Sequence, residues 1–239
     1  MKKILSSLLL IAVFFAFSCR NFGIRIKGNG VIGREMRNVG SFTDVSLQGS
    51  PDIILHLGDH CEVTIEADEN LIPYIETKVS GSELIVEIKS GSNISTHHNL
   101  VVHVTAPEFR EITIAGSGDI TAEEKINSNE KMKFKIAGSG DIKADVNAPD
   151  IDCSIAGSGN LSLSGETKEQ DISVKGNGDV QNENLKTEHT TVDIKGSGNV
   201  NVHASVKLDV DIAGSGDVEY RGNPSVTQNI HGSGEVKKM

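Results

Sequence analysis

The sequence predicts an all-β fold, a parallel β-solenoid whose coils contain about 18–22 residues each. The first observation is a short glycine-rich phrase, Gly-Ser-Gly-Asp or a close variant, that occurs seven times in the second half of the chain. The intervals between successive phrases are 22, 19, 19, 20, 18 and 18 residues. A period near 20 indicates that each repeat is one supersecondary unit stacked on the next. The first glycines of the phrases are Gly116, Gly138, Gly157, Gly176, Gly196, Gly214 and Gly232.

The second observation is a period-two pattern of apolar residues on both sides of each phrase. Two residues before the first glycine every repeat carries isoleucine or valine, and four residues after it isoleucine, leucine or valine. Period two is typical of a strand with one buried face, and β-branched residues suit such a surface. We expect the core to include Ile114, Ile136, Ile155, Val174, Ile194, Ile212 and Ile230, and Ile120, Ile142, Leu161, Val180, Val200, Val218 and Val236.

The glycine-rich phrase itself is predicted to form the corner of each coil. Both of its glycines fall on the inward parity, which indicates either positive φ or a close approach of backbones in neighbouring coils. Its Ser and its Asp or Asn fall on the outward parity. An antiparallel meander of the same period would need two turns in each repeat, and only one is marked by turn residues. With strands about 4.8 Å apart, the seven phrases would span roughly 30 Å of the solenoid axis.

The first half of the chain is predicted to belong to the same β-structure in a less regular form. Strand-like runs lie at 42–48, 52–57, 61–67, 83–89, 99–105 and 111–115. Residues 49–53, Gly-Ser-Pro-Asp-Ile, and residues 28–31, Gly-Asn-Gly-Val, resemble degenerate copies of the phrase. Because terminal repeats must close the apolar core against water, we expect 40–110 to be the irregular capping part and 111–239 the regular part.

The first residues read as a targeting segment. Two lysines precede an apolar run from Ile4 to Phe17, which is too short to span a membrane. The run ends at Ser18 and Cys19, an arrangement similar to a bacterial lipobox. We therefore expect a lipoprotein signal peptide at 1–18, a lipid anchor to the membrane at Cys19, and a tether with a first strand at 19–39. The alternative is an ordinary cleaved signal peptide with an unlipidated cysteine.

Composition excludes several classes of partner. Removing Lys2 and Lys3 with the leader leaves 21 basic and 33 acidic residues, a net charge of −12. This sign disfavours nucleic acid, whose phosphates need a basic face. Tryptophan is absent and there are two tyrosines, so stacking platforms for sugars or bases are not expected. Cys61 and Cys153 lie several coils apart, too far for a disulfide.

These residues resemble a known family. In order, they are the lipobox, Ile26–Gly30, Val39–Val45, Gly49–Ile53, Val63–Leu71 and the Gly-Ser-Gly-Asp series. The combination is similar to the putative auto-transporter adhesin, head GIN domain family of bacterial envelope lipoproteins, over roughly 25–239. The resemblance implies a right-handed, single-stranded parallel β-helix. It implies no activity and supplies no catalytic residues, and the adhesin name rests on architectural analogy.

The outward acidic residues of the corners are the first candidates for a site. Stacked corners would align Asp119, Asp141, Asp179 and Asp217 with Asn160, Asn199 and Glu235 in one column. The favoured interpretation is that each side chain caps its own turn. The alternative is calcium binding by the four aspartates, although calcium needs six to eight oxygens and the double glycine of known calcium solenoids is missing.

No other pattern carries chemistry. Histidines form two groups, His56 with His60 beside Cys61, and His97 and His98 with His103; exposed loop and strand histidines are favoured over a transition-metal site. Paired carboxylates show no sign of burial. The arginines lie away from the middle of the acidic column, which disfavours a polysaccharide lyase. We predict no catalytic residues, no cofactor and no metal beyond the calcium alternative.

The sequence therefore predicts a non-enzymatic, lipid-anchored β-solenoid of the cell envelope, on the outer membrane and facing either the periplasm or the outside. It would present a polar, acidic face to a glycan or to a protein. One alternative is a structural scaffold that self-associates, and Lys237 and Lys238 on the closing strand then favour a small homo-oligomer over a filament. The other alternative is a polysaccharide-active β-helix enzyme.

Overall fold

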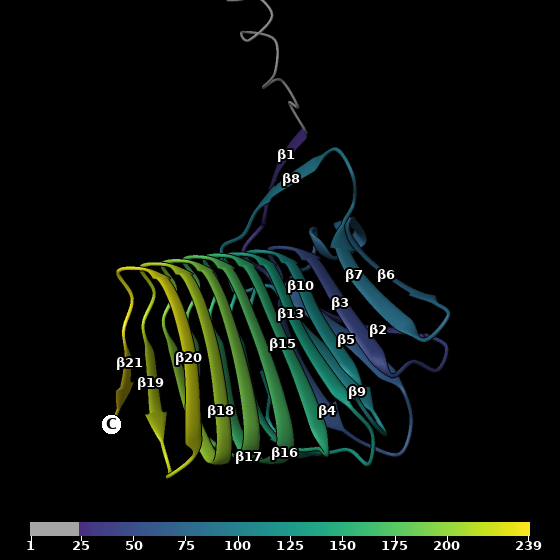
Figure 1. Ribbon diagram of the computed structural model, residues 1–239. Helices are drawn as coiled ribbons and strands as arrows, with labels where there is room; N and C mark the ends of the chain where they lie inside the picture. The colour runs from purple at the N-terminus through teal and green to yellow at the C-terminus, as the bar shows by residue number, and fades with distance from the viewer. Residues whose placement is uncertain (1–23) are drawn as a thin grey trace, which may run out of the picture.

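The computed structural model describes residues 24–239 and shows a parallel β-solenoid with a cap at its N-terminal end (Figure 1). The cap contains β1 (Ile24–Lys27), β2 (Ile32–Arg37), β5 (Glu62–Asp68), the one-turn 3₁₀ helix η1 (Ile72–Tyr74), β6 (Ile75–Ser80), β7 (Glu83–Ile88), β8 (Ser92–Ser95) and β9 (Val101–Ala106). The leader 1–18 and Cys19 lie outside the described residues, so the expected signal peptide and lipid anchor stay predictions.

The coils of the solenoid are built from two parallel sheets that meet at the glycine-rich corner. The first sheet, before the corner, contains β3 (Asp44–Gly49), β10 (Glu111–Gly116), β13 (Met132–Gly138), β15 (Asp150–Gly157) and β20 (Ser225–Gly232). The second sheet, after the corner, contains β4 (Asp52–Leu57), β11 (Ile120–Ala122), β12 (Ile126–Asn127), β14 (Ile142–Asn147), β19 (Val218–Arg221) and β21 (Val236–Lys238). Three long strands run through both sheets, β16 (Leu161–Gly176), β17 (Val180–Gly196) and β18 (Val200–Gly214).

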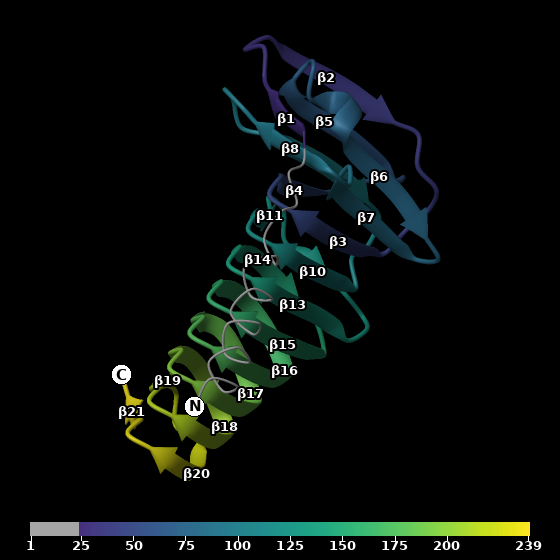
Figure 2. The same cartoon turned by 90° about the horizontal axis from the view of Figure 1, so that it is seen from above.

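The register of the coils confirms the predicted stacking of equivalent residues. Gly116 pairs with Gly138, and the same glycine pairs onward through every coil to Gly232. Seen from above, β10, β13, β15, β16, β17 and β18 form successive rungs along one axis (Figure 2). Residues at the same place in the phrase therefore form continuous columns along the solenoid.

The core lies between the two sheets and consists of the predicted period-two positions. In the first sheet Ile112, Phe134 and Val192 are almost fully buried. Ile120, Ile142 and Val200 close the core from the second sheet. Burying one such side chain stabilises the fold by roughly 1.5–3 kcal/mol. The final coil is less covered, because β20 and β21 pair with the preceding coil on one side only, and Gln228, which replaces the apolar residue there, is exposed.

The corner needs glycine because the backbones of neighbouring coils approach closely. A Cβ on Gly138 would lie 2.1 Å from the carbonyl oxygen of Gly116, and one on Gly140 would lie 2.1 Å from that of Gly118. Gly138 also has a φ of 143°. In return, the Ser139 amide donates a 2.9 Å hydrogen bond to the Gly116 oxygen. Both predicted reasons for the glycines therefore apply, and the serine of each corner is exposed as expected.

The first coil confirms one degenerate copy of the phrase. Gly49 pairs with Gly116, and Ile53 pairs with Ile120, so residues 49–53 occupy the next corner of the column. The second expected copy, at 28–31, is wrong. Those residues form the turn between β1, which pairs with β8 in a separate two-stranded sheet, and β2, which pairs with β5.

The cap differs from the solenoid in strand direction. β7 pairs with β3, and β9 pairs with β4, both in parallel. The remaining pairs are antiparallel: β6 with β7, β5 with β9, and β2 with β5. The predicted runs at 52–57, 61–67 and 83–89 match β4, β5 and β7, whereas β6 and β8 were not anticipated. The antiparallel strands end the parallel stack and cover its first coil (Figure 2).

Among residues 24–239 no helix has the length and apolar character that crossing a membrane requires.

Candidate functional site

The outward Asp and Asn residues of the corners form a hydrogen-bonded ladder that runs along the solenoid. The Asp141 amide donates to Asp119 Oδ1 at 2.9 Å, and the Asn160 amide donates to Asp141 Oδ1 at 2.8 Å. The ladder begins at Asp52, which accepts from the Asp119 amide at 3.1 Å. It continues through Asp179, Asn199, Asp217 and Glu235. Each side chain therefore caps the corner of the next coil, and the expectation that it caps its own turn needs this correction.

The four predicted calcium ligands are all members of this ladder. One oxygen of each of Asp119, Asp141, Asp179 and Asp217 already accepts a backbone amide from the neighbouring coil. Within residues 24–239, two other groups bring three ligand atoms within 4.8 Å of one another, and neither contains a member of this column. Calcium binding by the four aspartates stays a prediction.

The outer side of the first sheet, whose strands lie side by side in Figure 1, carries mostly polar residues, and we call it the first-sheet face. Its strand register aligns two rows, which are Asp152, Asp171, Thr191, Asp209 and Thr227, and Ser154, Ser173, Asp193, Asp211 and Asn229. Members of both rows line a shallow groove of about 370 Å³. Because adjacent strands are about 4.8 Å apart, hydroxyl and carboxylate groups recur at a regular spacing along this face.

Lysines offset part of the acidic charge on the first-sheet face. Lys131 lies 2.7 Å from Asp152 and 3.3 Å from Asp150, and these hydrogen bonds raise the pKa of the lysine. Lys195 pairs with Asp193 at 2.8 Å, and Lys207 pairs with Asp209. Within the described part of the chain, Asp171 and Asp211 form no ion pair with lysine or arginine. The face is therefore mixed in charge, with two carboxylates that form no ion pair among residues 24–239, of which Asp211 accepts a hydrogen bond from Asn229 Nδ2 at 3.2 Å.

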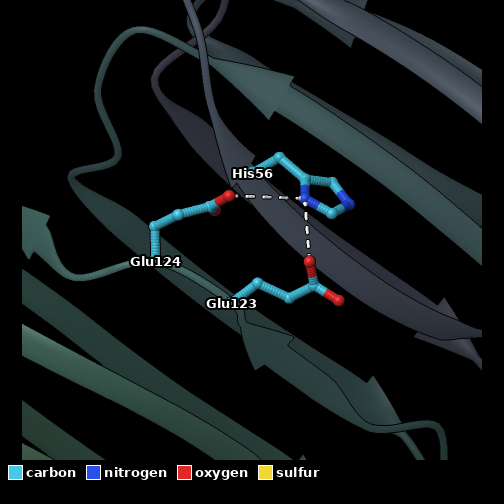
Figure 3. Close-up of side chains that lie close together, drawn as sticks. All are labelled: His56, Glu123 and Glu124. Atoms are coloured by element: carbon cyan, nitrogen blue, oxygen red, sulfur yellow. Dashed lines mark ion pairs between the residues drawn. The ribbon is translucent and has the colours of Figure 1, made fainter.

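The structure groups the histidines differently from the sequence. His56 on β4 stacks on His103 on β9, with ring centroids 5.4 Å apart, and His56 Nε2 lies 3.2 Å from His103 Nδ1. On the other side of the ring, His56 Nδ1 faces Glu123 and Glu124, which follow β11 (Figure 3). Sequence reasoning noted these paired carboxylates but did not connect them with His56, because they come from a coil 67 residues further along the chain.

The remaining histidines of the two predicted groups have other contacts. His60 pairs with Glu62 at 3.5 Å and does not join His56. His98 Nδ1 and the His97 amide contact the Asp68 carboxylate at 3.2 and 2.9 Å. Cys61 is close to the backbone of Phe42. The spacing of four between His56 and His60 therefore has no structural counterpart, since His56 lies near the end of β4 and His60 lies in the bend that leads to β5.

Asp68 is a fully buried carboxylate that holds the cap together. Its oxygens accept hydrogen bonds from the amides of His97 and Gly30, both at 2.9 Å. The bond from His97 is the main reason that the pKa of Asp68 is lowered, and burial opposes this shift. Asp68 thus joins the turn after β1 to the loop before β9, a structural task with no exposed chemistry.

The interior of the solenoid contains a small polar cluster around Cys153. The amides of Gln170 and Asn182 lie 3.8 and 3.9 Å from its sulfur, and Asn182 Oδ1 accepts the Leu163 amide at 2.9 Å. Burial raises the pKa of the Cys153 thiol to about 12, so the reactive thiolate is absent at neutral pH. Cys61 and Cys153 are both free thiols.

Comparison with known proteins places the chain in a family. Residues 41–224 match the family described as "Putative auto-transporter adhesin, head GIN domain". The chain belongs to this family. The match covers most of both the cap and the coils, so the predicted resemblance is confirmed.

Solved structures with the same fold come from Bacteroides and Parabacteroides species. A putative adhesin from Bacteroides fragilis has a TM-score of 0.83 at 18% identity, over 90% of this chain and 100% of the other. A putative lipid binding protein from Parabacteroides distasonis has a TM-score of 0.74 at 25% identity, over 90% and 99%. A putative adhesin from Parabacteroides merdae has a TM-score of 0.70 at 23% identity, over 90% and 99%. No curated protein matches the chain.

Proposed function

We propose that the protein is a non-enzymatic, lipid-anchored binding module of the bacterial cell envelope, and that the first-sheet face binds a glycan or a protein. The observation that carries the proposal is the alignment of Ser, Thr and Asp in two rows over neighbouring coils. The family name and the fold of the solved relatives support a binding role. They describe surfaces used for attachment and name no reaction.

The chemistry of this face suits an extended polar ligand. Strands about 4.8 Å apart present donors and acceptors at a repeat close to that of a sugar residue in an extended chain. Within the described residues, Asp171 and Asp211 supply carboxylates that form no ion pair with lysine or arginine. Lys131 and Lys195, which pair with Asp152 and Asp193, supply hydrogen-bond donors. A rigid array of this kind loses little side-chain freedom on binding, which reduces the entropic cost of a polar interface.

The cap provides a surface that suits a membrane-proximal position. Val31, Ile32 and Met36 are among the most exposed large apolar side chains of the described residues, at 52%, 53% and 67%. Ile32 and Met36 share one side of the edge strand β2 with Arg34. An apolar strand with a basic residue suits the headgroup region of a bilayer. With an anchor at Cys19, the regular coils would project away from the membrane.

Two measurements test the proposal. Protease treatment of intact cells decides whether the solenoid faces outward, since protection from cleavage restricts its partner to the periplasm. Binding to a glycan array and to cell surfaces is then compared between the wild type and the double variant Asp171→Ala/Asp211→Ala. Gln181→Ala/Asn201→Ala, at outward positions of the same region on the second sheet, is the matched control. Equal binding by both double variants and the wild type would contradict a role for the first-sheet face.

Self-association is the second candidate function. Val206 is 50% exposed and Val226 is 37% exposed near the C-terminal coils, where β20 leaves most of its residues exposed. An exposed strand with apolar side chains favours pairing with another chain. Light scattering of the purified protein distinguishes a small homo-oligomer from a monomer, and Val226→Lys is expected to dissociate an oligomer formed through this strand.

A further inference from the structure

We propose that His56, Glu123 and Glu124 form a zinc-binding site on the outer side of the second sheet, near the cap. The three side chains offer one ligand atom each, and these atoms all lie within 4.8 Å of one another. His56 Nδ1 is 3.5 Å from Glu123 Oε2 and 3.9 Å from Glu124 Oε1 (Figure 3). The site does not depend on the proposed adhesin function.

The strand register explains why these residues meet. β4 pairs with β9 on one side and with β11 on the other, all in parallel. Leu55 pairs with Ala122, so the next residues of the two chains, His56 and Glu123, are neighbours on the outer side of the sheet. His103 lies on the adjacent strand β9 and stacks on His56. His56 and His103 therefore stand on two hydrogen-bonded strands, and the two glutamates lie in the bend that directly follows the third strand, β11.

The distances and the ligand types fit a tetrahedral zinc ion. Zinc binds imidazole nitrogen and carboxylate oxygen at about 2.0–2.2 Å, which separates ligand atoms by roughly 3.4 Å in a tetrahedron. The observed 3.5 and 3.9 Å separations need only small side-chain movements to reach that geometry. Three protein ligands leave the fourth position to water or to an external group. Glu123 also lines a groove of about 320 Å³ next to the site, from which such a group could reach the ion.

Groups behind the ligands orient two of them. Glu124 Oε2 accepts the Leu57 amide at 3.3 Å, which leaves Oε1 directed at His56. His56 Nε2 lies 3.2 Å from His103 Nδ1. When the lone pair of His56 Nδ1 binds the metal, Nε2 carries the proton and donates a hydrogen bond to His103 Nδ1. A ligating histidine ordinarily has such a partner, which selects its tautomer and ring orientation.

The charge balance singles out this cluster from the other acidic group. Asp150, Asp152 and Asp171 also bring three oxygens together, but the Lys131 ammonium already lies between Asp150 and Asp152. Within residues 24–239, His56 is the only positively chargeable group that pairs with Glu123 and Glu124. Two adjacent carboxylates with one imidazole and no lysine or arginine present an uncompensated negative site.

The test is a titration of the purified, tag-free protein with zinc by calorimetry, after treatment with a chelator. We expect one equivalent to bind the wild type, and we expect His56→Ala to weaken binding about 100-fold or more. His60→Ala is the matched control, because His60 also lies 3.5 Å from a glutamate but has a single carboxylate partner. His103→Ala is expected to weaken binding about tenfold and keep the stoichiometry, as loss of an orienting partner does.

Cobalt substitution supplies a second readout. Cobalt(II) bound by nitrogen and oxygen in four-coordinate geometry gives visible absorption bands, and these bands should disappear in Glu123→Gln and Glu124→Gln. Melting temperatures measured in chelator show whether the variants are folded, and zinc should raise the melting temperature of the wild type and of His60→Ala but not that of Glu123→Gln or Glu124→Gln. The proposal is overturned if the wild type binds no zinc, if His56→Ala binds as well as the wild type, or if His60→Ala abolishes binding. A thiolate-to-cobalt band would likewise overturn it by assigning the metal to Cys61.

Discussion

The regular coils and the cap are stabilised in different ways. In the coils each contact recurs at the same place in every repeat, as in the glycine column at the corner and the ladder from Asp52 to Glu235. In the cap the decisive contacts occur once, and the buried Asp68 carboxylate joins Gly30, 38 residues before it, to His97, 29 residues after it. The coils therefore depend on repetition of one local geometry, whereas the cap depends on single long-range contacts.

A corner glycine provides the severest way to break the repetition. Gly157→Val would place a Cβ 2.2 Å from the Gly138 oxygen, at a φ of 139° that a β-branched residue does not tolerate. We expect the free energy of unfolding to fall by about 3 kcal/mol or more, because backbone must move in two coils. Urea denaturation measures this, with the exposed neighbour Ser158→Ala as a control that should change stability by less than about 0.5 kcal/mol. Similar losses in both variants would contradict close packing at the corner.

Removal of the Asp68 carboxylate should loosen the cap and spare the coils. Asp68→Ala removes the buried carboxylate that accepts the amides of Gly30 and His97, and hydrogen bonds to a charged group contribute more to stability than neutral ones. Hydrogen exchange measured by mass spectrometry should become faster at 28–31 and 95–100 and stay unchanged at 132–214. Asp59→Ala, an exposed residue of the same region, is the control. Faster exchange throughout the chain would show that the cap and the coils open as one unit.

Acid should also loosen the cap, because it protonates the Asp68 carboxylate. The pKa of Asp68 is lowered in the folded protein from its ordinary value of 3.8, chiefly by the His97 amide. The unfolded chain therefore binds the proton more readily, and the stability that this carboxylate contributes is present above pH 3.8 and lost as the pH falls below it. Protection factors at 28–31, taken relative to the intrinsic exchange rate at each pH, should fall below that pH in the wild type, and Asp68→Ala should lack this dependence. A variant with the same acid dependence as the wild type would assign it to other carboxylates.

Much of the solenoid could be predicted because the information is local. The Gly-Ser-Gly phrase and its apolar flanks lie within about ten residues, so they determine the corner, the buried parity and the outward serine together. The same reasoning identified the degenerate copy of the phrase at 49–53, whose Gly49 pairs with Gly116. It could not give strand direction in the cap, since parallel and antiparallel strands share a period of two. For that reason β2, β5 and β6 were assigned no antiparallel pairing.

The contacts in the candidate sites depend on how neighbouring coils align, and this alignment cannot be read from local sequence patterns. The Asp141 oxygen was expected to stay within its own turn, yet the adjacent coil brings the Asn160 amide to 2.8 Å. His56 and Glu123 meet because the coil containing β4 stacks directly on β11. The segment between them folds away as β5 to β9, and nothing in a spacing of 67 residues indicates that arrangement. The first-sheet rows, in contrast, follow from the repeat once the coils are known to stack in register.

One rung of the ladder tests how much the repeated hydrogen bonds contribute. Asp141→Ala removes the acceptor for both the backbone and the side-chain amide of Asn160, at 2.8 and 2.9 Å. Because these groups are near the surface, water replaces part of the interaction, and we expect a loss of about 1 kcal/mol. Ser139→Ala at the same corner is the matched control. If Asp141→Ala were as stable as this control, the ladder would be a consequence of stacking and contribute nothing to it.

The two cysteines within residues 24–239 report on how readily each region opens, one in the cap region and one in the coils. Cys61 lies half-buried beside the cap, whereas Cys153 is buried in the coils with a pKa of about 12. Since burial raises the latter pKa above its usual 9.0, the associated stability is complete below pH 9 and declines as the pH rises toward 12. At pH 8 an alkylating reagent should therefore modify Cys61 first, and Cys153 only when the coils open. In Cys61→Ser, Cys153 is expected to resist alkylation until the protein is denatured, and rapid labelling of Cys153, identified by peptide mass spectrometry, would show that the coils open as readily as the cap.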